Sequence, residues 1–208
     1  MSKAVLISIK PEWTEKIVQG KKTIEVRRTA PKEVPFKAYI YCTSQKFDGE
    51  ILLTADKKVE RRYKHCRDNG DIPLAGKVIG EFICDKVYLI KNQGNRFVVA
   101  NEEQGVTNEI ARQSCLDYDD MDIYLGDKDG YGWHISDLKI YDKPKELSEF
   151  TSPRVCGNYK DLPAYIHVGC NICEYSYTIN CMIKCRIDGR KPLTRPPQSY
   201  MYVEEVEQ

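Results

Sequence analysis

Short hydrophobic runs and alternating polar and apolar positions predict a series of β-strands along the chain. Alternation of period two is typical of a strand with one buried face, whereas a short continuous apolar run is typical of a strand buried on both faces. The residues that fit these patterns are 4–9, 23–28, 37–43, 76–90, 130–141 and 198–206. Gly80 interrupts the run 76–90 and predicts a bulge or a close approach of another backbone.

Helical signals occur in two parts of the chain. Pro11 suits the first turn of a helix, which needs no donated N–H, and Gly20 provides the left-handed residue that ends it. Residues 107–115 predict a second helix, and Asp117 predicts the N-cap of a third that ends near Gly126. Strands and helices together predict a mixed α+β fold.

The segment 23–28 places its polar residues on one side. In a strand, Ile24 and Val26 would face the core, while Thr23, Glu25 and Arg27 would face the other way. The sequence therefore predicts a polar surface on this strand.

Charge is distributed unevenly, although the net charge is only +1. Residues 1–67 contain 16 basic and 8 acidic residues, and residues 68–150 contain 9 and 17. A basic third suggests a face for phosphate, and the alternative is that the two thirds neutralise each other across the fold. Part of the basic charge lies in the polar segment 45–73, for which helix, extended hairpin and mobile arm all remain open; it contains Lys57, Lys58, Arg61, Arg62, Lys64 and Arg67.

Composition indicates a folded protein, because 41% of the 208 residues are hydrophobic and 30% are charged. Residues 1–10 contain only a short apolar stretch before Pro11, so we expect no secretory signal, and no segment has the roughly 20 apolar residues of a membrane span. We expect a cytoplasmic protein without a membrane partner.

Nine cysteines in a reducing compartment favour metal binding or burial over disulfides. Four of them fall within a short span, which makes zinc the cofactor to expect and buried thiols the alternative: Cys170, Cys173, Cys181 and Cys185. His167 is able to replace one of these ligands.

The segment Gly20-Lys21-Lys22-Thr23-Ile24-Glu25-Val26-Arg27 resembles the G-x-K-x-x-x-x-R signature of the ASCH domain, a branch of the PUA-like superfamily. The stretches LISIKPEW, GKVIGEF, DGYGWHISDLKIYDKPKEL and TRPPQSYMYVEE also resemble this family, in particular small ASCH proteins of phages and prophages. The resemblance implies a PUA-like small β-barrel flanked by helices, formed by residues 1–150 and 194–208. Residues 151–193 would be a Cys-rich insertion before the C-terminal strand.

What the resemblance implies about function is a cleft beside the first helix and second strand that holds RNA or a modified nucleotide. Lys22 would offer a point charge to phosphate, and Arg27 a planar fork for phosphate or a base edge. Glu25 would accept from an amino group or hold Arg27, and an internal Glu25–Arg27 ion pair is the structural alternative. Lys21 and Thr23 complete the strip that we expect to bind the ligand.

Two residues of the later strand are further candidates for the cleft. Trp133 would stack on a base or belong to the core, and His134 would line the cleft or serve as a structural imidazole.

Two other functions remain open. Some ASCH proteins resemble amidohydrolases of acetylated cytidine, which makes Lys22 and Glu25 candidate catalytic residues of an amidohydrolase or ribonuclease. Glu25 occupies a position where that pattern has Thr. The second is a phage-encoded factor that docks on a host protein through the basic arm 57–67.

Overall fold

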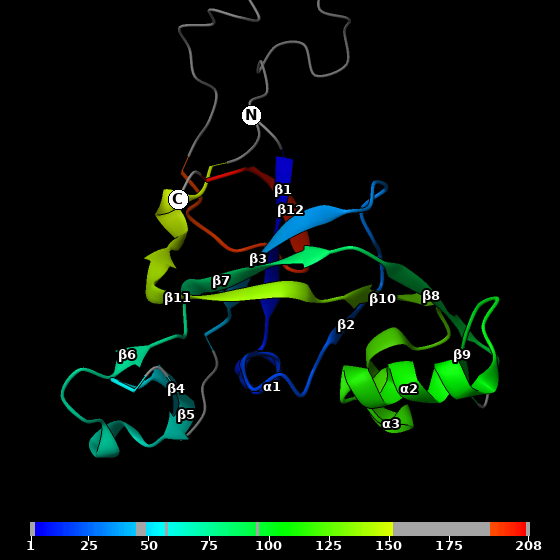
Figure 1. The fold of residues 1–208 in the computed structure, drawn as a ribbon, viewed down its shortest axis with the longest axis horizontal. Coiled ribbons are helices and arrows are strands. Elements are labelled where there is room, and N and C mark those ends of the chain that lie inside the picture. The colour runs from blue at the N-terminus through cyan, green and yellow to red at the C-terminus, as the bar shows by residue number, and fades with distance from the viewer. Residues whose placement is uncertain (1–2, 45–48, 57, 95, 152–191, 207–208) are drawn as a thin grey trace, which may run out of the picture.

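The computed structural model describes residues 3–44, 49–56, 58–94, 96–151 and 192–206. These residues form a mixed α+β fold, as predicted, with three sheets and three α-helices. Figure 1 shows α1 (Pro11–Val18) between two appendages, a small sheet on one side and the pair α2 (Gln104–Ser114) and α3 (Tyr118–Leu125) on the other.

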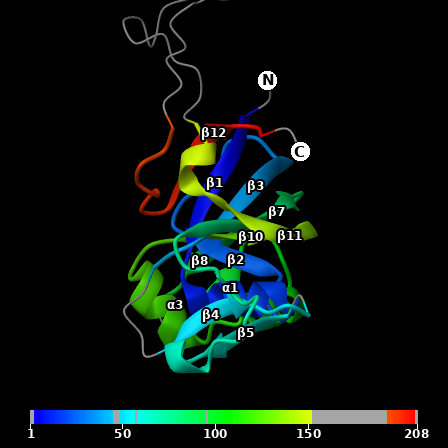
Figure 2. The same ribbon diagram turned by 90° about the vertical axis from the view of Figure 1, so that its left-hand side faces the viewer.

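The largest sheet has five strands in the order β11-β7-β3-β1-β12. Their bounds are Ser136–Glu146 for β11, Lys77–Cys84 for β7, Phe36–Cys42 for β3, Lys3–Ile9 for β1 and Tyr200–Glu204 for β12. Strands β1 and β3 are parallel, and the other pairs are antiparallel. Because β12 pairs with β1 from Lys3 opposite Glu204 onward, one strand begins where the other ends, at the same end of the sheet (Figure 2).

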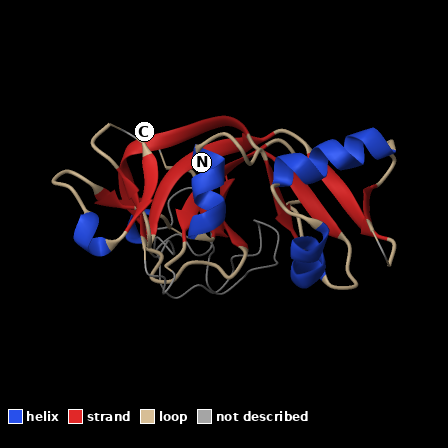
Figure 3. Ribbon diagram, turned by 90° about the horizontal axis from the view of Figure 1, so that it is seen from below, coloured by secondary structure: helices blue, strands red, loops and turns tan. Residues whose placement is uncertain are grey.

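A second sheet of four strands has the order β2-β10-β8-β9. Their bounds are Ile24–Arg27, Gly130–His134, Val87–Asn92 and Phe97–Val99. Helix α2 packs on β2 and β9, so that Ile24 and Val26 are buried in a cluster with Ile110 and Leu125. The helices lie on the outside of the sheets (Figure 3).

Two of the predicted strands are each divided between these sheets. The run 76–90 forms β7 in the first sheet and β8 in the second, and the run 130–141 forms β10 and β11. The chain crosses between sheets at Asp85 and Ile135. The hydrophobic pattern alone does not reveal such a crossing, because pairing with distant strands, and not the pattern along one strand, assigns a strand to a sheet. The strand order of each sheet is open at both ends, so no closed barrel is detected among the described residues.

The third sheet is formed by the described part of the basic segment 45–73, whose shape the sequence left open. It consists of β5 (Val59–Arg62), β4 (Glu50–Leu53) and β6 (Ile72–Pro73), with a short 3₁₀ turn, η1, at Lys64–Cys66. Ile51, Leu53 and Val59 join the main core, which explains how this hairpin is fixed to the rest of the fold.

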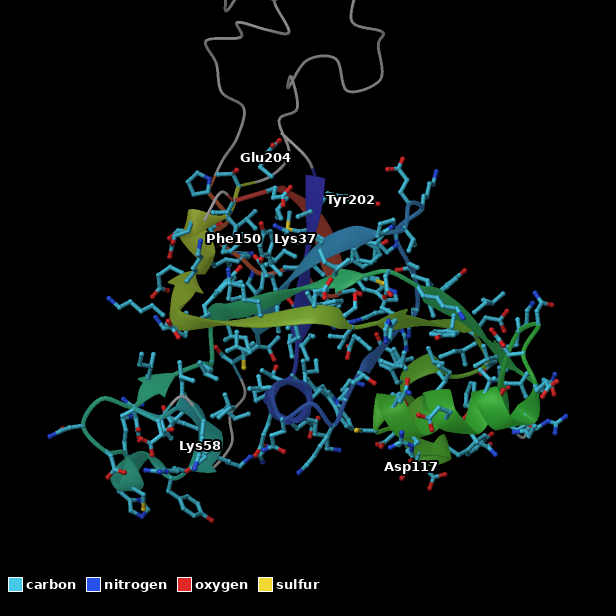
Figure 4. The ribbon with its side chains drawn as sticks, viewed as in Figure 1. Lys37, Lys58, Asp117, Phe150, Tyr202 and Glu204 are labelled. Atoms are coloured by element: carbon cyan, nitrogen blue, oxygen red, sulfur yellow. The ribbon has the colours of Figure 1, made fainter. Side chains whose placement is uncertain are left out.

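Several local predictions are confirmed. Gly20 has a φ of 69° after α1, and Asp117 Oδ1 accepts from the backbone N–H of Asp120 at the start of α3. Figure 4 labels Asp117 beside the pair α2 and α3. A Cβ on Gly80 would lie 2.4 Å from the Lys139 carbonyl oxygen, so this glycine allows β11 to approach β7.

A second 3₁₀ turn, η2, covers Leu147–Glu149. No helix in the described part of the chain is long and apolar enough to span a bilayer.

Candidate functional site

The loop that follows α1 is fastened to the C-terminal end of α2. The backbone N–H of Thr23 donates to the Gln113 carbonyl at 3.0 Å, and Cys115 Sγ donates to the Lys21 carbonyl at 3.2 Å. Gln113 lies in the last turn of α2, where backbone carbonyls lack helical partners, and Cys115 is the residue directly after the helix. The loop is thereby held in a fixed position between α1 and β2.

Lys22 turns inward from this loop and is only 2% exposed. Its Nζ donates to the Ser114 carbonyl at 2.6 Å, lies 3.4 Å from Glu25 Oε2, and sits 5.3 Å from the centroid of the Trp13 ring. Burial lowers the pKa of Lys22 below its ordinary value of 10.5, against the opposing effect of Glu25. Desolvation is therefore the main cause of the lowered pKa, and the charge of Arg27 adds a smaller effect in the same direction.

Glu25 and Arg27 lie on the same face of β2 and complete an ionic triad with Lys22. Arg27 Nη2 is 3.0 Å from Glu25 Oε1 and donates to the Ser8 carbonyl at 2.5 Å. Both residues are 6% exposed, so the polar face predicted for this strand exists but is buried rather than open to solvent. The internal ion pair that the sequence offered as an alternative is present.

Two polar atoms of the triad are buried without a hydrogen-bond partner among the described residues. They are Glu25 Oε2, an acceptor, and Arg27 Nε, a donor. A buried polar atom without a partner costs free energy, about 1–3 kcal/mol, and such atoms mark places where a ligand or water completes the set.

All three members of the triad line a cleft of about 690 Å³. Its walls come mainly from β1, α1, β2, α3 and the segment before β12. Besides the triad, the lining residues are Ser8, Lys10, Glu12, Trp13, Val26, Arg28, Thr43, Leu116, Asp120, Ile123, Tyr124, Pro196, Pro197 and Gln198. Four of the lining residues are basic and three acidic. The cleft is therefore mixed in charge, not the strongly basic surface that the sequence suggested.

Other residues predicted for the site lie elsewhere. Lys21 is exposed and Thr23 half-buried, and neither lines the cleft. Trp133 is fully buried and packs edge-on against Phe36 and Tyr200, so the core interpretation is confirmed.

His134 lies on the opposite strand face from Trp133 and also does not line the cleft. Its Nδ1 is 2.6 Å from Asp85 Oδ1, which holds the pKa of that carboxyl below its ordinary range. The ring is thus engaged in a contact at the turn between β7 and β8.

The sequence did not single out several residues that build the cleft. Ser8, Arg28 and Ser114 hold its parts together, and Tyr124 and Pro197 form walls. Only Arg28 gave a signal, since it follows Arg27 directly. The rest come from chain positions that approach β2 only through the tertiary fold.

The predicted zinc ligands Cys170, Cys173, Cys181 and Cys185, with His167, lie outside the described residues. Within the part of the chain that the structure describes, no group of three or more His, Cys, Asp or Glu side chains is arranged to hold a metal.

The basic segment of the third sheet has its own counter-ions. Arg62 contacts Glu60 at 2.9 Å, Asp68 at 2.5 Å and Asp71 at 3.5 Å, and Arg67 pairs with Glu50. These contacts reduce the positive potential that a docking arm would present.

Comparison with known structures identifies the class of fold. The chain matches solved ASCH proteins along nearly its whole length, with a probability of 1.00. The individual structures come from Zymomonas mobilis: a point mutant of its ASCH protein is 16% identical, with a TM-score of 0.50 over 98% of this chain and 92% of that one. The unmutated Z. mobilis ASCH is 15% identical, with a TM-score of 0.48 over 97% and 88%. At these identities the likeness concerns the fold, and no protein-family model and no curated protein matches the sequence.

Proposed function

We propose that this chain is an ASCH-type protein whose cleft beside α1 and β2 binds a nucleoside unit, within RNA or as a free modified nucleotide. One observation carries the proposal: Glu25 Oε2 and Arg27 Nε are buried, lack hydrogen-bond partners among the described residues, and belong to side chains that line a cleft. The Watson–Crick edge of each nucleobase has a donor next to an acceptor, and such a pair is able to meet both.

The remaining lining of the cleft suits a flat, partly polar ligand. Trp13 and Tyr124 supply aromatic surface, and Val26 and Leu116 supply apolar surface. Pockets for small ligands are typically apolar with a few placed polar groups, and their volumes of roughly 300–1,000 Å³ include that of this cleft. A nucleoside combines the required planar ring with polar edges.

Replacement of Arg27 by Lys tests the proposal. Lysine keeps the charge but loses the guanidinium fork, and we expect the affinity for nucleosides and short RNA to fall at least ~10-fold, about 1.4 kcal/mol. Titration calorimetry with a panel of nucleosides measures this fall. Arg61→Lys on the third sheet is the matched control, and its affinity should equal that of the parent protein. Equal affinity in Arg27→Lys and the parent would reject the triad as the binding group.

A second candidate function is hydrolysis of an N-acylated nucleobase, favoured by the buried Lys22 with its lowered pKa. The neutral amine would take a proton from water as the hydroxyl oxygen adds to the amide carbonyl. It would then return that proton to the leaving amino group as the C–N bond breaks. Glu25, 3.4 Å from Nζ, would hold the amine in place.

Lys22→Ala separates the enzyme from a binding module. Loss of turnover on acetylated nucleosides with retained binding supports hydrolysis, and Lys21→Ala, an exposed neighbour, should keep full turnover. No turnover by the parent protein rejects the second candidate and leaves the binding proposal intact.

A further inference from the structure

The cleft has an apolar part that the ionic triad does not use. Leu116, Ile123 and Tyr124 supply it from the region of α3, and Pro196 and Pro197 supply it from the segment before β12. Ile123 is 83% exposed, the highest value among the large hydrophobic residues that the structure describes as exposed. A large apolar side chain in open contact with water beside a cleft is a feature of binding surfaces.

The wall from α3 is held rigidly against β2. Arg28, directly after β2, donates to the Tyr124 carbonyl from Nε at 2.9 Å and from Nη2 at 2.5 Å. Its guanidinium also lies 5.4 Å from the centroid of the Tyr124 ring, a cation–π distance. The last turn of α3 therefore has a fixed position before any ligand arrives.

The proline wall is fixed to β1 through one residue. Ser8 Oγ donates to the Pro197 carbonyl at 2.6 Å, and the Ser8 backbone N–H donates to the Ser199 carbonyl at 3.0 Å. The Ser8 carbonyl in turn accepts from Arg27. Ser8 thereby joins the apolar wall to the polar triad and sets the distance between them.

Charges at the edge of the cleft are balanced. Lys10 and Arg28 are exposed there, and Glu12 and Asp120 oppose them. Phosphate in this region would gain little net attraction, so an additional ligand group gains its affinity from apolar contact rather than from charge.

We infer that the apolar part of the cleft is a second subsite that stacks a neighbouring base, so that the cleft holds two consecutive nucleotides of single-stranded RNA. This inference rests on the proposed function, in which the first base meets the triad. Base stacking on apolar or aromatic side chains tolerates any sequence. The subsite therefore sets the length of the ligand and not the identity of its second base.

A comparison of an adenosine mononucleotide with the dinucleotide ApA tests the second subsite. We expect ApA to bind the full chain at least ~10-fold more tightly, within the range that stacking of one base supplies. A dinucleotide whose second position lacks its base should bind like the mononucleotide. The gain should also persist at high salt, because phosphate attraction contributes little.

Ile123→Ser removes the apolar surface without loss of packing, because Ile123 is almost fully exposed. We expect the advantage of ApA to fall below ~3-fold in this variant while mononucleotide affinity stays at the parent level. Tyr202→Ser is the control, since Tyr202 is an exposed hydrophobic residue that does not line the cleft, and it should keep the full advantage.

The outcomes separate the two claims. If the parent binds the mononucleotide and ApA equally, or if Ile123→Ser keeps the advantage of ApA, the second subsite is rejected and the proposed function stands. If the parent binds neither, both are rejected.

Discussion

The ionic triad in the cleft and the ionic cluster on the third sheet use the same residue types in different surroundings. In the triad, Lys22, Glu25 and Arg27 are each at most 6% exposed, and the two cations share the one carboxylate of Glu25. On the third sheet, Arg62 alone has three carboxylate neighbours, and the Asp68 side chain is 74% exposed. The triad has two cations for one carboxylate and is buried, whereas Arg62 has three carboxylates and part of its cluster is exposed to solvent.

The contrast between the two clusters indicates where a ligand is to be expected. Exposed ion pairs are screened by water and contribute little to stability, and their partners already satisfy them. Buried charges pay a desolvation cost that only good partners offset. A buried group with polar atoms that lack a hydrogen-bond partner gains most from a ligand, which is why the triad is the better candidate site.

Removal of the shared carboxylate should have the largest effect. Glu25→Ala leaves Lys22 and Arg27 buried without a counter-ion, and we expect a loss of about 3–5 kcal/mol in the free energy of unfolding. Glu60→Ala on the third sheet should cost at most ~1 kcal/mol, because Arg62 keeps Asp68 and Asp71. Urea unfolding measures both, and equal losses would remove the distinction between the clusters.

A change of pH should isolate the contribution of Lys22 to the stability of the fold. The folded-state pKa of Lys22 lies below its ordinary 10.5, so between these two values the unfolded chain binds more protons than the folded one. Stability due to Lys22 therefore rises with pH through this window. We expect the unfolding free energy of the parent minus that of Lys22→Met to increase as pH is raised toward 10.5. A difference that is constant or shrinks would contradict the direction of the shift.

Salt should reveal the smallest effect. Arg67 pairs with Glu50, and their side chains are 38% and 21% exposed. Arg67→Met should cost about 0.2–1 kcal/mol at low salt and almost nothing in about 1 M salt, where the screening length is roughly 3 Å. The same unfolding measurement in both buffers tests this, and a cost that salt leaves unchanged would assign Arg67 to packing instead of charge.

Much of the fold was predictable because its signals are local. Pro11 and Gly20 bound α1, Asp117 caps α3, and the apolar run of β1 needs no partner to be recognised. The crossings at Asp85 and Ile135 were not predictable, because only pairing with distant strands assigns the two sides of each crossing to different sheets.

Of the residues predicted for the site, Lys22, Glu25 and Arg27 line the cleft, whereas Lys21, Thr23, Trp133 and His134 do not. The sequence grouped Glu25 and Arg27 with Thr23 through strand alternation, and it added Lys22 through the resemblance to the ASCH signature. It did not indicate their burial, because the covering groups lie far away in the chain: Ser114 is 92 positions from Lys22, and the prolines follow much later. The sequence likewise did not decide that Trp133 is buried in the core or that His134 lies beside Asp85, because the residues that surround them are distant in the chain.

One bridge near the C-terminus bears on how this protein tolerates change. Thr151 and Pro192 face each other as an isolated antiparallel bridge, and the Leu193 N–H donates to the Phe150 carbonyl at 2.9 Å. Phe150 and Leu193 are both buried in one cluster with β1 and β3. The two ends of the intervening forty residues are therefore adjacent and independently anchored, so a short turn in their place should preserve the folded body. We expect a change in chain length at this junction to have little effect on the cleft, because the flanking residues pack on β1 and β3.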